Sequence, residues 1–317
     1  MSAAEPRIDI VIVNWNSGTY LADCLKSIAE APMDCAEVKS LTLVDNASSD
    51  GSNQTPVPQG LRNVRISRIE NDVNQGFGKA CNLGSARGNA PYVLFLNPDT
   101  RLRPKCMLLP LKFLEAPENQ DIAVAGIQLI DNEGNVARSC CRIPTPYQLL
   151  MHSVGVDRLP LISPRGYMMT EWSHNDTRRV GHVIGAYYLI RRSIFEELGG
   201  FDEDFFVYLE DLDLSTRIAR KNLACAYLSH ISAFHAGGGS SRKILARRLC
   251  YSLKSRLIYS QKHYNRFHQL LIKFATLVVE PLIRCSRALL VLSWRDFKVT
   301  CRGYGLLYRD LFKSAQG

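Results

Sequence analysis

The sequence predicts an α/β fold in which helices flank a mostly parallel central sheet. Apolar runs of strand length alternate with helical segments through the first hundred residues, a pattern typical of βαβ units with parallel strands. Each of these runs ends in a polar turn. The chain has 317 residues, 46% of them hydrophobic and 22% charged, which suits one large globular domain with an appendage, or two domains.

The first hundred residues are expected to hold four strands and two helices. The strands are expected at 8–13, 40–44, 64–69 and 92–96, and the helices at 20–29 and 79–86. The run 92–96 is apolar throughout, as in a central strand that is buried on both faces. In the first helix Leu21, Leu25 and Ile28 share one face, and Ser17 or Thr19 is the expected N-cap.

The second half of the chain is more mixed. Strands are expected at 122–129, 181–191 and 225–228, and helices at 193–198 and 209–221. Residues 142–178 have weak periodicity and are expected to form a mobile loop region. From about residue 243 onward the pattern is helical, basic and amphipathic.

The positive charge is concentrated in the C-terminal tail. The net charge is +9, yet residues 241–317 carry 16 Lys and Arg against three acids, so the first 240 residues are net acidic. Because apolar residues lie among the basic ones at helical spacing, the tail favours an anionic membrane surface. The alternative is that its apolar stripe packs on the preceding domain or on a second subunit, as in a homodimer. The acidic body and the lack of a recognition motif argue against nucleic acid.

The composition also predicts a location for the protein. No uncharged apolar stretch reaches the roughly 20 residues of a membrane span, and the polar residues 1–7 do not suggest a signal peptide. Ten cysteines without a CxxC pair suit buried thiols in a reducing cytosol. We therefore expect a cytoplasmic protein that is peripheral at the inner face of the cell membrane.

Polar turns follow the four expected strands of the first hundred residues. These turns lie at 14–18, 45–52, 74–78 and 97–100. The carboxyl ends of parallel strands share one edge of a sheet, where ligands bind. Asp45 there suits hydrogen bonds from a ribose hydroxyl or a base N–H, and Gly76 and Gly78 allow the backbone to approach a ligand closely. No spacing matches GxGxxG or a P-loop, which argues against dinucleotide-dependent dehydrogenases and P-loop ATPases.

The turn Asn97-Pro98-Asp99-Thr100 ends the buried strand with one carboxylate. Asn, Pro and Asp all favour turns, so a plain turn is one interpretation. The other is a ligand site, because a hard carboxylate at a sheet edge suits Mg²⁺ or Mn²⁺ bridged to phosphate oxygens. His235 opens a glycine-rich loop that lets the backbone approach a phosphate. Asp99 and His235 could then hold one divalent ion together with diphosphate oxygens.

A second acidic segment follows an aromatic run at the start of a helix. Glu210, Asp211 and Asp213 lie within four positions, and the helix dipole favours acids there, which is a purely structural interpretation. Glu210 and Asp211 also follow apolar residues directly, and loss of water would raise a carboxyl pKa toward the range of a general base. Asp213 and Arg217 are four positions apart and are expected to form a structural ion pair.

In their order along the chain, these segments resemble a family 2 inverting glycosyltransferase with a GT-A nucleotide-sugar-binding fold, most closely its rhamnosyltransferase-like branch. The matching segments are 10–16, 44–52, 74–78, 95–99, 199–206, 210–214 and His235. The resemblance implies a GT-A catalytic domain at 1–240, with a donor-binding half at about 1–100 and an acceptor half at about 101–240. A basic amphipathic helical extension at 241–317 would follow, and it has no diagnostic motif.

The resemblance also implies roles in donor binding. Asn14, Asn16 and Asp45 would hold the nucleotide base and ribose, while Asn74 and Gly76 would line the donor cleft.

Residues further along the chain would bind the metal and catalyse the reaction. Asn97 and Asp99 occupy the place of the family's Asp-x-Asp motif, so Asp99 would bind the metal and diphosphate, with His235 as a further ligand. The loss of one carboxylate at Asn97 lowers the expected affinity for metal. Asp211 would deprotonate the acceptor hydroxyl, with Glu210 as the alternative base.

The predicted function is transfer of a sugar from a dTDP- or UDP-sugar to a hydroxyl of a glycan or lipid-linked acceptor in cell-surface polysaccharide synthesis. Rhamnose is favoured by the resemblance, and Mg²⁺ or Mn²⁺ is the expected cofactor. One alternative is a non-catalytic protein that binds membrane surfaces on the same scaffold. The other is a nucleotidyltransferase, which would need a glycine-rich, basic loop after the first strand, and residues 14–18 do not provide one.

Overall fold

The structure is a computed structural model that describes residues 7–31, 37–156, 166–237 and 244–314. The chain divides into two compact units. Unit 1 consists of Met1–Ile143, Trp172–Glu203 and Glu210–Ser240, and unit 2 of Pro144–Glu171, Asp204–Leu209 and Ser241–Gly317. The expected domain boundary at residue 240 stays a prediction.

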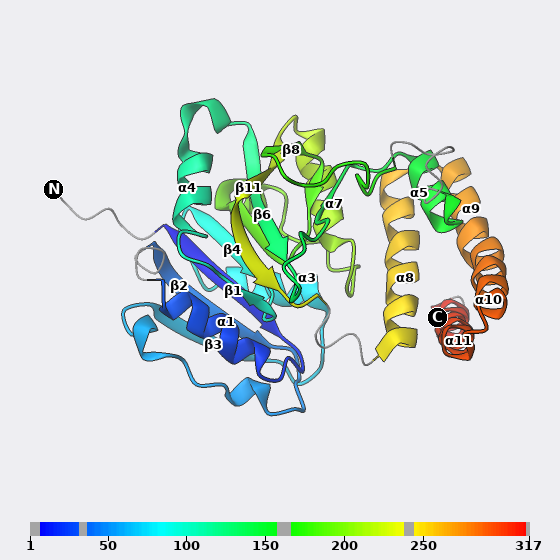
Figure 1. Cartoon of the computed structure of the whole chain (residues 1–317), viewed down its shortest axis with the longest axis horizontal. Helices are drawn as coiled ribbons and strands as arrows, with labels where there is room; N and C mark the ends of the chain where they lie inside the picture. The colour runs from blue at the N-terminus through cyan, green and yellow to red at the C-terminus, as the bar shows by residue number, and fades with distance from the viewer. Residues whose placement is uncertain (1–6, 32–36, 157–165, 238–243, 315–317) are drawn as a thin grey trace. The chain divides into compact units, whose positions relative to one another are not determined.

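Within the described residues, unit 1 is built around a nine-stranded mixed sheet in the order β3-β2-β1-β4-β10-β6-β11-β5, with β8 paired to β11 (Figure 1). Its strands are β1 (Ile8–Asn14), β2 (Val38–Asp45), β3 (Arg65–Glu70), β4 (Tyr92–Leu96), β5 (Thr100–Arg101), β6 (Ile122–Ile130), β8 (Arg178–Val180), β10 (Tyr187–Arg191) and β11 (Ala224–His235). Strands β3, β2, β1 and β4 are parallel, whereas β10 is antiparallel to both neighbours. The predicted α/β fold with a mostly parallel sheet is confirmed.

Helices cover both faces of this sheet. They are α1 (Tyr20–Ala29), α3 (Phe77–Ser85), α4 (Leu108–Glu115), α6 (Arg192–Glu197) and α7 (Glu210–Arg220), with short 3-10 turns at Ser52–Gln54, Gln59–Leu61 and Pro117–Asn119. Successive residues of a strand point to opposite faces. Ile10 and Ile12 of β1 therefore join a core cluster with Leu25 of α1. On the other face α3 approaches so closely that a Cβ on Gly84 would collide with Val11.

Unit 2 is helical in its described residues. It contains α5 (Pro146–Ser153), α8 (Leu245–His263), α9 (Arg266–Phe274), the π-helical turn η6 (Ala275–Val279), α10 (Glu280–Leu290) and α11 (Trp294–Ser314). Helices α8 and α11 share a core that includes Leu253 and Leu307. Arg256 and Glu280 form a buried ion pair at 2.5 Å. None of the helices in the described ranges is both long and apolar enough to cross a bilayer.

Three expected elements differ from the structure. The region 142–178 is not only loop, because Thr145 and Gln148 form a capping box that begins α5. The strand expected at 181–191 is split into β9 (His182–Val183), which pairs with β7 (Cys140–Cys141), and β10. The strand expected at 225–228 continues to His235, because an irregularity after Leu228 lets β11 stay paired with β6.

A buried ion pair lies at the end of the sheet opposite to the polar turns. Arg192 donates to Asp9 Oδ2 at 2.8 Å, and the N–H of Ala90 donates to the same oxygen at 2.7 Å. The hydroxyl of Ser40 donates to Asp9 Oδ1 at 2.5 Å. Asp9 and Arg192 are both buried, and Asp9 is the buried partner of Arg192, whose other ion pair is with the exposed Glu196.

The substitution Asp9→Asn should lower the free energy of unfolding by about 3–5 kcal/mol, since it removes the buried partner of Arg192 and leaves its guanidinium only the exposed carboxylate of Glu196. Urea unfolding measures the change. Glu30→Gln is the matched control because its ion pair with Lys26 is exposed, and it should cost at most about 1 kcal/mol. Equal unfolding midpoints for the two variants would contradict the role given to this pair.

Candidate active site

The carboxyl ends of β1 and β2 are joined by side-chain hydrogen bonds. The parallel register places Asn14 beside Asp45, and Asn14 Nδ2 donates to Asp45 Oδ1 at 2.7 Å. The same amide donates to the hydroxyls of Ser52 at 2.9 Å and Ser48 at 3.1 Å. Asp45 Oδ2 accepts from the N–H of Ser48 at 2.9 Å. Asn14 and Asp45 thus hold the loop 45–52 in place at the sheet edge.

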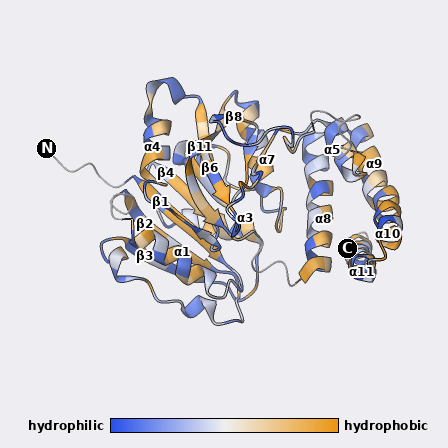
Figure 2. Cartoon of the chain, in the orientation of Figure 1, coloured by the Kyte–Doolittle hydropathy of each residue, from blue (hydrophilic) through white to orange (hydrophobic). Residues whose placement is uncertain are grey.

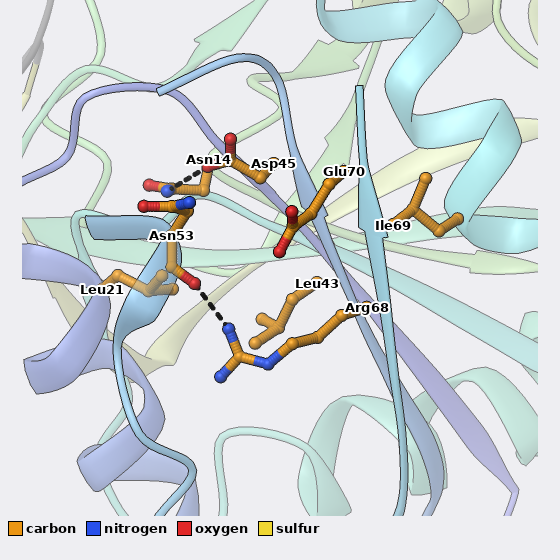
Figure 3. Close-up of a pocket in the computed structure, with 8 residues that line it drawn as sticks. All are labelled: Asn14, Leu21, Leu43, Asp45, Asn53, Arg68, Ile69 and Glu70. Carbon is orange, nitrogen blue, oxygen red and sulfur yellow. Dashed lines mark hydrogen bonds between the residues drawn. The ribbon is translucent and has the colours of Figure 1, made fainter. Parts of the chain in front are cut away.

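A small pocket lies at these strand ends (Figure 3). It is lined by Asn14, Leu21, Leu43, Asp45, Asn53, Arg68, Ile69 and Glu70. Arg68 Nη1 donates to the carbonyl oxygen of Asn53 at 2.7 Å. Asp45 and Glu70 are partners in the register of β2 and β3. Their carboxylates are acceptors for the hydroxyl or N–H groups of a ligand.

Two further asparagines organise the neighbouring loops. Asn16 has a left-handed backbone with φ of 50°. Its side-chain oxygen accepts from the N–H of Ser49 at 2.7 Å, and its own N–H donates to the hydroxyl of Ser48 at 3.0 Å. Asn74 Oδ1 accepts from the N–H of Gly76 at 2.9 Å, which fixes the turn before α3. The residues predicted to hold the donor therefore also shape the loops.

Asn46 joins the loop after β2 to the loop before α3. Its amide donates to the carbonyl oxygen of Gly76 at 3.0 Å and to Asn74 Oδ1 at 3.1 Å. Its oxygen accepts from Asn71 Nδ2 at 3.0 Å and from the N–H of Gln75 at 3.1 Å. Sequence reasoning missed Asn46, although an asparagine directly after a strand end was a usable signal.

Asp99 and His235 meet because two strands pair. In the antiparallel register of β5 and β11, His235 lies opposite Thr100. His235 Nε2 is 3.3 Å from Asp99 Oδ1. This nitrogen is buried and has no hydrogen-bond partner among the described residues. Residues 238–243 of the glycine-rich loop lie outside the described residues.

The donor set of Asp99 and His235 fits a divalent cation. Carboxylate oxygens suit Mn²⁺ and Mg²⁺, imidazole nitrogens bind divalent transition metals, and Nε2 of His235 lies next to the Asp99 carboxylate without a hydrogen bond among the described residues. In the part of the chain that the structure describes, no group of three or more His, Cys, Asp and Glu residues is arranged to hold a metal. A metal at this pair would therefore take its remaining ligands from outside these side chains.

Asp211 lies on the first turn of α7 and is tied to the same sheet edge. Its Oδ2 accepts from the N–H of Gly185 at 2.7 Å, and its Oδ1 accepts from the N–H of Leu212 at 2.8 Å. The next residue, Ala186, accepts from the N–H of Asn97 at 3.1 Å. Consecutive residues thus connect the carboxylate of Asp211 to the turn that contains Asp99.

The two neighbouring acids differ in their surroundings. Glu210 is 5% exposed, and its Oε2 has no hydrogen-bond partner in the described ranges. Burial, helped by the charge of Asp211, raises the pKa of Glu210 well above its ordinary value. The side chain of Asp211 is 18% exposed. Glu210 therefore holds its proton to higher pH than an ordinary glutamate does, and the geometry favours Asp211 as the carboxylate that can accept a proton.

A buried histidine lies next to the carboxylate of Asp211. The sequence pattern did not predict it as part of the site. His182 Nε2 is 3.7 Å from Asp211 Oδ2, and its Nδ1 shares a hydrogen bond with the hydroxyl of Ser215 at 3.0 Å. Burial lowers the pKa of His182 although the charge of Asp211 opposes this, so the imidazole is uncharged near neutral pH. The ion pair expected between Asp213 and Arg217 is confirmed, at 2.7 Å.

Comparison with known proteins identifies the family to which the chain belongs. Residues 9–199 match the model of glycosyl transferase family 2. The chain is 30% identical to N-acetylglucosaminyl-diphospho-decaprenol L-rhamnosyltransferase of Mycobacterium tuberculosis over 271 residues, which cover 80% of this chain and 83% of that protein. It is 26% identical to rhamnosyltransferase WbbL of Escherichia coli K12 over 178 residues, which cover 53% and 61%. The chain belongs to glycosyl transferase family 2 and is a glycosyltransferase, as predicted.

Solved structures with the same architecture confirm the GT-A fold. Mannosyltransferase PcManGT from Pyrobaculum calidifontis, in complex with GDP-Man and Mn²⁺, has a TM-score of 0.52 at 14% identity and covers 98% of this chain and 83% of its own. TarS 1-349 of S. aureus, in complex with UDP-GlcNAc, has a TM-score of 0.53 at 13% identity, with coverage of 96% and 92%.

The buried proton of Glu210 should make the protein less stable as the pH rises. The folded state binds this proton above the ordinary glutamate pKa of 4.5 while the unfolded state releases it, so the free energy of unfolding falls with increasing pH. Glu210→Gln cannot ionise, and its urea midpoint should fall less over the same range. Glu118→Gln, at an exposed acid, should follow the wild type. Equal pH slopes for wild type and Glu210→Gln would contradict the assignment.

Proposed function

We propose that the enzyme is an inverting rhamnosyltransferase that uses a dTDP- or UDP-activated sugar and a lipid-linked glycan acceptor. The observation that carries the proposal is the partly exposed carboxylate of Asp211, tied through Gly185 and Ala186 to the turn of Asp99. The name of the M. tuberculosis relative supports both the sugar and the acceptor class, since it is an L-rhamnosyltransferase named for N-acetylglucosaminyl-diphospho-decaprenol, a lipid-linked sugar.

In this proposal the donor binds along the ends of β1, β2 and β4. Asn14, Asn16 and Asp45 hold the base and ribose, and Asn74 and Gly76 line the adjacent wall. Asp99 and His235 hold Mn²⁺ or Mg²⁺, which, when bound, supplies positive charge for the departing diphosphate. Complexes of structural neighbours with Mn²⁺ support a divalent cation.

The chemical step needs one carboxylate. An acceptor hydroxyl transfers its proton to Asp211 and attacks the anomeric carbon from the face opposite to the diphosphate. The bond from that carbon to the diphosphate oxygen breaks, and its electron pair leaves with the nucleoside diphosphate. Displacement from the opposite face inverts the anomeric centre. The N–H groups of Gly185 and Leu212 keep the carboxylate of Asp211 oriented during the transfer.

We also infer that the enzyme is cytoplasmic and works at the inner face of the cell membrane in polysaccharide synthesis. A lipid-linked acceptor, as named for the M. tuberculosis relative, supports this location. The predicted homodimer stays a prediction.

Removal of the proposed base should lower turnover strongly without loss of donor binding. Asp211→Asn is expected to lower kcat by about 10²–10⁴-fold, the range for loss of a general base, because the amide cannot accept the proton. Initial rates of sugar transfer and the shift of Tm with nucleoside diphosphate measure the two effects.

Glu210→Gln is the matched comparison for this prediction. Since Glu210 is buried and protonated, its substitution should lower kcat far less than Asp211→Asn. If the larger loss falls on Glu210→Gln instead, the assignment of the base to Asp211 is wrong.

Donor binding should depend on a divalent cation through Asp99 and His235. A thermal shift series with UDP, dTDP and GDP should raise Tm for one nucleotide when Mn²⁺ is present. Asp99→Asn should remove this shift and His235→Ala should weaken it, because each removes one ligand. A nucleotide shift that persists without metal and in both variants would refute the metal site, and no shift with any nucleotide would favour a non-catalytic protein.

A further inference from the structure

Helix α9 presents a row of large apolar side chains to solvent. Phe267, Leu270, Leu271 and Phe274 are all exposed. Their spacing of three, four and seven positions places them on one side of the helix. Ile272 is buried, so another side of α9 already packs within unit 2. The exposed row is thus not the packing face of this helix.

The row continues through the π-helical turn into α10. Val278 and Leu282 follow Phe274 at steps of four residues, and both are exposed. Residues four positions apart lie on the same side of a helix, so the row continues along one side. Thr276, inside the turn, is buried. Figure 2 shows hydrophobic residues along both helices.

The segment 289–294, which runs from the last residues of α10 through the turn to the first residue of α11, is strongly exposed and apolar. It carries Leu289, Leu290, Val291, Leu292 and Trp294, all exposed, with Leu290 at 84% and Leu292 at 85% of full exposure. Turns in water usually consist of Gly, Pro, Asn, Asp and Ser. Apolar patches on this scale mark contact with a protein or a membrane. We call this turn and the exposed row of α9 and α10 the apolar face.

Positive charge surrounds the apolar face. Residues 266–314 contain nine Lys and Arg against three acids. Two of these acids are already paired, Glu280 with Arg256 and Asp310 with Lys254. The exposed basic residues are Arg266, Lys273, Arg287, Arg295, Lys298, Arg302, Arg309 and Lys313. A second copy of the chain would bring the same charge against this face, so the surface is complementary to an anionic partner.

We propose that the apolar face docks on an anionic lipid bilayer, with α9 and α10 in the interfacial layer and the turn 289–294 inserted among the acyl chains. Amphipathic helices with an apolar row and basic flanks bind in this manner. Trp294 suits the boundary between headgroups and acyl chains. The inference rests on the proposed function, because the bilayer is the surface that would carry a lipid-linked acceptor.

The structure also changes which helix of the tail can bind the membrane. The sequence placed apolar residues of 244–257 among basic ones in the same amphipathic segment. In the structure Leu253 and Leu257 of α8 are buried. The apolar side chains that remain available to lipid are those of α9, α10 and the turn that follows.

Vesicle flotation of the full-length protein tests the proposal. The wild type should float with phosphatidylcholine vesicles that contain phosphatidylglycerol and should bind pure phosphatidylcholine far more weakly. The double variant Leu290→Asp with Leu292→Asp should reduce binding by about 100-fold or more, because two leucine side chains can then no longer be buried in the membrane. Tyr147→Asp, at an exposed residue of α5 outside the apolar face, is the matched control and should bind as the wild type does.

Three outcomes would overturn the proposal. In the first, the double variant floats as well as the wild type does. In the second, the wild type binds pure phosphatidylcholine vesicles as well as vesicles with phosphatidylglycerol. In the third, the wild type binds no vesicles but sediments as a dimer, and the double variant sediments as a monomer. Hydrolysis of the sugar donor in solution is measured on the same samples and should be unchanged by the double variant. Absence of hydrolysis in the wild type would count against the proposed function alone, while flotation still reports on the surface.

Discussion

The hydrogen bonds at the start of β10 hold the two parts of the candidate site together. Because β10 is antiparallel to β4, its first residue, Tyr187, lies opposite the last residue of β4. The two preceding residues then reach both sides of the site, Ala186 toward Asn97 and Gly185 toward Asp211. A parallel strand at this position would present its other end to the turn. The reversal of one strand therefore brings the carboxylate of Asp211 close to the turn that contains Asn97 and Asp99.

Asparagine side chains shape the donor side of the site. An amide is both donor and acceptor and carries no net charge, so one side chain can join two loops. Asn14 and Asn46 do this for the loops after β1, β2 and β3. The negative charge at this edge comes from a few carboxylates, among them those of Asp45 and Asp99. Asp99 is paired with a histidine rather than with a second acid, so the proposed metal site offers one carboxylate where an Asp-x-Asp pair would offer two.

The four parallel strands and their polar turns were predictable because strand period and turn chemistry are local properties. The contacts of Asp211 with Gly185 and His182 were not, since they depend on the pairing of β10 with β4, which no local pattern encodes. Helix α5 was missed although Thr145 and Gln148 have capping-box spacing, because so short a helix shows little apolar period. The basic tail was predicted as amphipathic, but only the packing of α8 on α11 decides which apolar side chains remain exposed.

The buried pair of Asp9 and Arg192 can form only late in protein synthesis. The two residues are 183 positions apart in the sequence. At the usual elongation rates, Asp9 waits roughly 10 to 40 seconds for its cationic partner to be made. Over part of that time β4 also lacks β10, and an unpaired strand edge is a template for aggregation. Until β10 is made, the N-terminal strands therefore present an edge that can pair with another chain.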